Sequence, residues 1–247
     1  MKSYLTLFKN ELKLNIRDMN MVIFAVIMPL IVLVILGFIY GTKPAFDGAD
    51  YSFLQQSFGA VTAISMCAGG LMGLPIIISD YRERKILKRF KVTPISPIKL
   101  LLVELAIYIL YCMISLVTCA IAARIFWDVR LIGNPLAFIG SWFLAMISTL
   151  SIGMFVGGIA KNSKQSGVIA SILYFPMLVF SGTTLPLEVM PKGLQKVVSL
   201  FPFTQGIKLV KNTFLGIETD KVWLPVIIML GVTIVCIALS VRLFKWE

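Results

Sequence analysis

The sequence offers few side chains that could carry out chemistry. It has no histidine in 247 residues, so the most common general base and metal ligand is missing. Its cysteines lie in apolar runs without the paired spacing of a zinc or redox site, at Cys67, Cys112, Cys119 and Cys236. We expect no metal or haem centre, and we interpret these cysteines as small buried side chains.

The chain also lacks a loop that could hold nucleotide phosphates. Such a loop needs the pattern G-x-x-x-x-G-K-[ST]. The nearest stretch with glycine and lysine, GGIAKNSKQSG at 157–167, has neither that spacing nor the Gly-Lys pair. Any work driven by ATP would therefore have to come from a separate chain.

One carboxylate, Glu104, lies a short way inside a long apolar run that begins at Leu100. A charge inside a membrane span is costly and usually has a function. The alternative is a carboxylate near the membrane interface that pairs with a basic residue of the preceding loop. A proton-coupled carrier would need several such groups, so a single one argues against ion coupling.

The composition indicates a membrane protein. The chain is 58% hydrophobic and 14% charged, against roughly 45–50% and about 25% in an average soluble domain, which excludes an ordinary cytosolic enzyme. Crossing a bilayer takes about 20 apolar residues. We expect an all-α integral membrane protein with one domain over 1–247 and six transmembrane helices, at 22–40, 53–79, 100–123, 136–160, 168–185 and 223–244.

Two further segments are predicted to lie at the membrane surface. In residues 1–20, Leu5, Phe8 and Leu12 recur at helical spacing while Lys9 and Lys13 lie on another face, as in an interfacial amphipathic helix. Residues 186–216 are only moderately apolar and rich in proline and lysine. We expect them to form re-entrant outer helices that line a cavity, because irregular backbone at that depth needs protein or water around it.

The chain has a net charge of +11, and its basic residues are concentrated in one segment. In a soluble protein it would suggest nucleic-acid binding, but here it fits retained cytoplasmic loops and contact with membrane lipids, without nucleic acid. The bias favours cytoplasmic N and C termini, although a reversed topology stays open. Seven of the 23 basic residues fall in 80–99: Arg82, Arg84, Lys85, Lys88, Arg89, Lys91 and Lys99.

Small residues mark the second predicted span. Gly69 and Gly73 are four residues apart, a spacing that allows two helices to approach closely. The favoured interpretation is packing within one bundle, and the alternative is a dimer seam.

A short basic helix is predicted at 81–91, between the second and third spans. Its apolar residues Ile86, Leu87 and Phe90 share one side, and Pro94 and Pro97 stop it. By composition, a lipid anchor and a protein-docking helix are equally compatible with this segment. Its short connections to two spans and its proline-stiffened exit favour docking.

Two motifs resemble a known family. The stretch ERKILKRFKVTPIS, 83–96, resembles the loop between the second and third spans of type-2 ABC transporter permeases. The stretch SGTTLPLEVMPKGLQKVVSLFPFTQGIKLVKNTFLG, 181–216, is similar to the exit from their fifth span. The family often has glycine where this chain has Ile86 or its neighbour Lys85, so we expect a more regular helix here.

The resemblance implies the permease subunit of an ATP-driven exporter in a bacterial cell membrane. It implies two permeases, either two copies of this chain or one copy and a homologous permease. Each would bind a separate ATPase subunit, so that ATP and Mg lie on the partner and no cofactor on this chain. The coupling helix that docks on the ATPase would use Glu83, Arg84, Ile86, Leu87, Lys88, Arg89 and Phe90.

The apolar seam between the two permeases favours an amphiphilic cargo such as a drug, antimicrobial peptide, lipid or glycan, and drug export would confer antibiotic resistance. Two other classes stay open: a secondary carrier, which should show inverted repeats and paired intramembrane charges, and a non-transporting membrane anchor or immunity protein.

Overall fold

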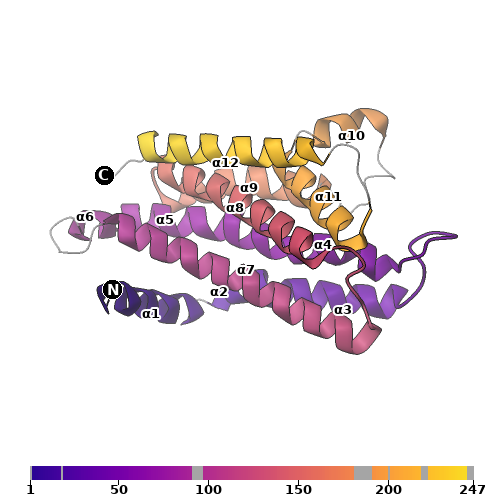
Figure 1. Ribbon diagram of the computed structural model, residues 1–247. Coiled ribbons are helices and arrows are strands. Elements are labelled where there is room, and N and C mark those ends of the chain that lie inside the picture. Colours follow the sequence, from indigo (N-terminus) through magenta and orange to yellow (C-terminus); the bar gives the residue numbers. More distant parts are fainter. Residues whose placement is uncertain are drawn as a thin grey trace.

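The computed structural model describes residues 2–17, 19–90, 97–180, 191–199, 201–217 and 222–243. Within these ranges every regular element is a helix, and the long helices lie side by side in one bundle (Figure 1). The all-α architecture expected from the sequence is confirmed.

Five helices are long and apolar enough to cross a membrane. Two of them are interrupted by π-helical segments, η1 and η2. The first consists of α2 (Met19–Val22), η1 (Ile23–Ile27) and α3 (Met28–Tyr40), and the second of α4 (Phe53–Met66), η2 (Cys67–Gly73) and α5 (Leu74–Glu83). The other three are α7 (Pro97–Trp127), α8 (Pro135–Ile159) and α12 (Trp223–Leu243).

The predicted span 168–185 corresponds to α9 (Ser163–Phe180), which is not one of these five helices. It begins five residues before the prediction, with a polar first turn. The end of the prediction, 181–185, lies outside the described residues. The described residues contain five candidate spans. The count of six spans therefore stays a prediction.

Helices also occupy the two segments predicted at the membrane surface. Residues 1–20 contain α1 (Lys2–Arg17), which packs against α7. The segment 186–216 contains α10 (Lys192–Val198) and α11 (Pro202–Leu215), and its first residues, 186–190, lie outside the described ranges. One face of α11 is buried against α4, α8 and α12.

Side chains fix where several helices begin. At α4, the Ser52 hydroxyl accepts a hydrogen bond from the Gln55 amide at 3.2 Å, and the Gln55 side chain accepts one from the Ser52 amide at 2.7 Å. At α8, the Asn134 side chain accepts from the Leu136 amide at 2.9 Å, and Pro135 takes the first helical position. These caps satisfy amide groups that have no partner inside their own helix.

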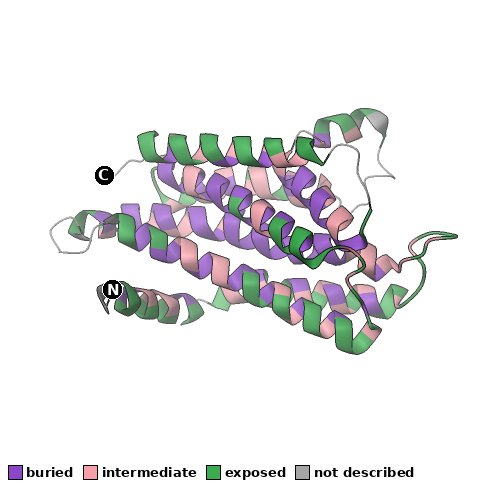
Figure 2. Ribbon diagram, in the orientation of Figure 1, coloured by how far each residue is buried: buried purple, intermediate pink, exposed green. Residues whose placement is uncertain are grey.

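The helix built from α4, η2 and α5 lies at the centre of the bundle (Figure 2). Within its most apolar stretch 83% of the residues are buried, compared with 22% for Met19–Tyr40 and 17% for Trp223–Leu243. The outward face of α12 carries large exposed side chains, among them Trp223, Ile227 and Val241. An apolar outer face of this kind suits contact with lipid.

Glycines allow the central helix to approach its neighbours closely. A Cβ atom on Gly153 of α8 would overlap the carbonyl oxygen of Gly70. On another side, a Cβ atom on Gly69 would come within 3.2 Å of the Tyr108 ring in α7, and one on Gly73 within 2.5 Å of it. Gly69 and Gly73 therefore pack inside the chain, as the sequence favoured over a dimer seam.

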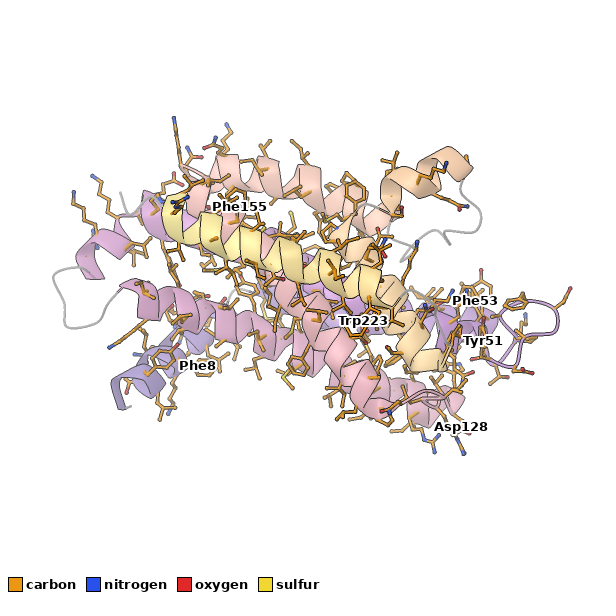
Figure 3. All side chains as sticks on the ribbon, turned by 45° about the horizontal axis from the view of Figure 1, so that its top comes forward. Phe8, Tyr51, Phe53, Asp128, Phe155 and Trp223 are labelled. Atoms are coloured by element: carbon orange, nitrogen blue, oxygen red, sulfur yellow. The ribbon has the colours of Figure 1, made fainter. Side chains whose placement is uncertain are left out.

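The bundle has two distinct ends. The start of α1, the short helix α6 (Ile86–Phe90) and the end of α12 share one end (Figure 1). Phe8 marks this end in Figure 3, and Tyr51, Phe53 and Asp128 mark the other. At that other end Arg124 and Arg130 pair with Asp128 at 2.7 and 3.0 Å. The hydrogen bond from Arg130, together with the charges of both arginines, holds the pKa of Asp128 below its usual range.

Gly153→Ala should destabilise the protein by about 1–3 kcal/mol, because the added methyl group has to separate two helix backbones. The measurement is the thermal unfolding midpoint of the purified protein in detergent. Gly140→Ala is the matched control, since Gly140 lies in the same helix with no atom within 4 Å of the added Cβ. Equal loss in both variants would contradict the proposed close contact.

Candidate coupling site

Three consecutive residues at the end of α5 connect the central helix to four other helices. Tyr81 bonds to α1 and α7, Arg82 to α8, and Glu83 to α9. The short helix α6 begins three residues after Glu83, beyond a turn at Arg84 and Lys85. This junction is the candidate functional site, because it links the segment that carries α6 to four other helices.

Arg82 caps the end of α8. Arg82 is only 6% exposed. Its guanidinium donates hydrogen bonds to the carbonyls of Gly157 at 3.2 Å, Gly158 at 2.9 Å and Ala160. The last carbonyls of a helix have no partner inside the helix, and that end carries partial negative charge. A cation with several fixed donors meets both needs.

The side chain of Glu83, the last residue of α5, lies against the first residue of α9. Its carboxylate accepts hydrogen bonds from the Ser163 amide at 2.9 Å and the Ser163 hydroxyl at 2.8 Å. A negative charge is favourable at the amino end of a helix. Adjacent residues of opposite charge therefore hold the end of α8 and the start of α9 to the same point.

Tyr81 joins α5 to the N-terminal helix and to α7. Its hydroxyl lies 2.8 Å from a carboxylate oxygen of Glu104 and 2.9 Å from one of Glu11. The Asn15 amide donates to both oxygens of Glu104, at 3.3 and 3.2 Å. Glu104 is fully buried, and the described residues give it these neutral donors in place of the basic loop residue considered from the sequence.

The predicted coupling helix 81–91 is not a single helix. The central helix continues to Glu83, a turn follows at Arg84 and Lys85, and α6 covers only Ile86–Phe90. Lys85 has φ of +58°, a conformation that glycine adopts without the steric penalty of a Cβ atom. The prediction of a more regular helix is therefore wrong: the backbone breaks here although neither Lys85 nor Ile86 is a glycine.

Some of the predicted docking residues are exposed in the structure and others are buried. Lys85, Lys88 and Arg89 are exposed at the end of the bundle, and Arg84 is exposed while pairing with Asp80 at 2.9 Å.

Leu87 is fully buried in the protein's own core and Ile86 is partly buried against it. Leu87 therefore anchors α6 to the bundle. The side chain of Phe90 lies outside the described set.

The sequence analysis did not single out Tyr81, Arg82, Asn15 or Ser163. Arg82 is one of the cations of 80–99, but it lies only three residues beyond the predicted span, a position from which a long side chain can reach a neighbouring helix end. Glu11 and Asn15 are four residues apart on α1, so they share a face. Their partners come from distant segments and could not be read from spacing.

The chain matches a known family of membrane proteins. The model of the ABC-2 type transporter family matches residues 2–215. The chain belongs to the ABC-2 type transporter family. The resemblance drawn from the two loop motifs is therefore confirmed.

Two relatives from Escherichia coli K12 are similar to part of the chain. "Inner membrane transport permease YhhJ" is 26% identical over 172 residues, covering 67% of this chain and 46% of the relative. "Probable multidrug ABC transporter permease YbhS" is 26% identical over 161 residues, covering 64% and 42%. The chain thus spans a little under half the length of the curated relatives it matches.

Arg82→Ala should lower the free energy of unfolding by about 3 kcal/mol, because the buried carbonyls at the end of α8 lose charged hydrogen-bond donors. Chemical denaturation in detergent measures the change. Arg84→Ala is the control two residues away; its exposed pair with Asp80 should contribute less than about 1 kcal/mol. Similar losses in the two variants would show that Arg82 is not a cap.

Lys85→Gly should raise the free energy of unfolding by about 1 kcal/mol, since glycine removes the strain of a Cβ atom at positive φ. Lys85→Ala separates this effect from charge, because it removes the ammonium group and keeps the Cβ. An equal gain in Lys85→Ala would assign the effect to charge and not to the backbone. Thermal unfolding of both proteins makes the comparison.

Proposed function

We propose that this chain is the membrane-spanning subunit of an ATP-driven exporter and that a separate ATPase subunit, carrying ATP and Mg, docks on α6. The observation that carries the proposal is the way α6 is attached to the bundle. This exposed cationic helix is fastened by the buried Leu87 and is continuous with a junction that caps α8 and α9. Motion of α6 is therefore transmitted to several helices at once.

Exposed charge supports the docking surface. Lys85, Lys88 and Arg89 project from the same short segment, so a partner groove with acidic side chains would complement it. In this proposal Glu83 and Arg84 flank the contact, Ile86 and Phe90 add apolar area, and Leu87 holds the helix in place.

Six crossings with both termini in the cytoplasm are part of the proposal. An even number of crossings is needed when the first helix starts and the last helix finishes at the same end of a bundle, as the start of α1 and the end of α12 do in Figure 1. The helix α9, which starts beside the end of α8, would supply the sixth crossing. The cationic α6 at that same end favours the cytoplasmic side, with α1 at its membrane interface and α10 and α11 re-entrant on the outer side.

The interior favours an amphiphilic cargo such as a drug, antimicrobial peptide, lipid or glycan. Among the described residues the buried charged side chains are Arg82 and Glu104, and both already have partners in the chain. An apolar cavity of about 330 Å³ between α7, α8 and α12 has Ser151 and Ser240 as its polar members. Surfaces of this kind suit apolar chains better than small ions. A second copy or a homologous permease would complete the pathway.

The double variant Lys88→Glu with Arg89→Glu tests the proposal. Charge reversal should weaken assembly with the ATPase at least about tenfold, which corresponds to about 1.4 kcal/mol of contact energy. The measurement is co-purification of an ABC ATPase subunit co-expressed with this chain, followed by the ATPase rate of the reconstituted complex.

Lys43→Glu is the control, because Lys43 is an exposed cation in the loop between α3 and α4 at the other end of the bundle. Undiminished assembly in the double variant, with Lys43→Glu unchanged, would overturn docking on α6. Failure of any ATPase to co-purify with the unaltered protein would favour a carrier or a membrane anchor instead.

A further inference from the structure

The contacts around Tyr81 require one more hydrogen than the tyrosine can supply. Its hydroxyl oxygen lies within hydrogen-bond distance of two carboxylate oxygens, on Glu104 at 2.8 Å and on Glu11 at 2.9 Å. A phenol carries a single hydrogen and can donate it to one of them. The other contact then joins two oxygen atoms, which needs a hydrogen on the carboxyl group.

We propose that Glu11, Tyr81 and Glu104 form a proton-binding site that fastens the N-terminal helix α1 to the bundle. One glutamate is a carboxylic acid that donates to the tyrosine oxygen, and the tyrosine donates in turn to the other glutamate, a carboxylate. The chain of hydrogen bonds joins α1, α5 and α7. Its ligand is a single proton.

No cation replaces that proton among the described side chains. On the helices that carry or flank the site, α1, α5, α6 and α7, the other described charged groups are either exposed or already bonded. Arg82 is bonded to the carbonyls of α8, Glu83 to Ser163, and Asp80 to Arg84. The exposed cations are Lys9, Lys13 and Arg17 of α1, Lys88 and Arg89 of α6, and Lys99 at the start of α7.

The other elements packed on α7 bring no charge. By sequence, α3, α4, α8, η1 and η2 contain no Asp, Glu, Lys or Arg. Their titratable groups face elsewhere, since Cys67 faces Cys112 and Tyr40 stacks on Phe53. Tyr108, one turn beyond Glu104, faces Gly73. A buried carboxylate without a cation is costly, and a bound proton removes that cost.

The site also holds much of the contact between α1 and the bundle. Asn15 is 7% exposed and donates to Glu104, and Leu7 is 8% exposed in the apolar core. Loss of the proton would leave two carboxylates facing one phenol hydrogen, and their repulsion would oppose docking. The docked state binds the proton, so docking is strongest at low pH and weakens as pH rises, by up to about tenfold per pH unit for one proton.

The same proton bears on the coupling junction, an extension that rests on the proposed function. Tyr81 directly precedes Arg82 and Glu83, so release of α1 would remove one of the restraints on the segment that caps α8 and α9. The tests below need only the permease itself, so their outcome is independent of whether an ATPase docks on α6.

Infrared spectroscopy of the protein, in a detergent without ester or carboxyl groups, detects the proton directly. We expect one carbonyl-stretch band of a buried carboxylic acid at low pH, its loss as pH rises, and its absence in either Glu11→Gln or Glu104→Gln. Glu83→Gln is the matched control and should keep the band, because its carboxylate accepts from Ser163. No such band at any pH, or a band retained in both Gln variants, would overturn the proposal.

The docking of α1 gives a second readout. Spin labels at the exposed positions Lys9 and Lys164, with the native cysteines replaced, should report a longer distance as pH rises. In Glu104→Gln the neutral side chain mimics the acid, so the distance should stay short at all pH values, whereas Tyr81→Phe should lengthen it throughout. A distance independent of pH in the protein with both glutamates would also overturn the proposal.

Discussion

The last carbonyls of α8 and the first amide of α9 have no partners inside their own helices. Two charged side chains of the central helix supply those partners. Arg82 donates to the last carbonyls of α8, and Glu83 accepts from the first residue of α9. Both residues follow each other on α5, so the two helix ends share one rigid point. The position of α6, which begins three residues after Glu83, is set by the same restraint.

Close packing makes this junction mechanically useful. Gly70 and Gly153 bring the backbones of the central helix and α8 into contact, and Gly157 lies against Pro75 and Ile78 one turn nearer the junction. Glycine contacts leave little room for one helix to slide without the other. A displacement of α5 would therefore carry α8 with it.

In the proposed proton site, the hydrogen-bonded group around Glu104 would make the same junction sensitive to pH. A buried carboxyl group that faces another carboxyl group is sensitive to a proton in a way that an exposed ion pair such as Arg84 with Asp80 is not. The N-terminal helix, the end of α5 and the start of α7 meet there through side chains from distant segments. Protonation and partner docking would thus act on adjacent residues of one chain segment.

The sequence by itself determined the class of the protein, because runs of about 20 apolar residues and clustered cations have few solutions in a membrane. It also predicted the five helices that are long and apolar enough to cross a membrane, the family motifs, and the close packing of Gly69 and Gly73 within one bundle. Only the tertiary structure decided that Leu87 faces the core, that the helix predicted at 81–91 breaks at Lys85, and that Arg82 and Glu104 find their partners on other helices. Arg82 finds its Gly157 partner 75 positions away and Glu104 finds Asn15 89 positions away, and local spacing contains no record of which helices will be neighbours.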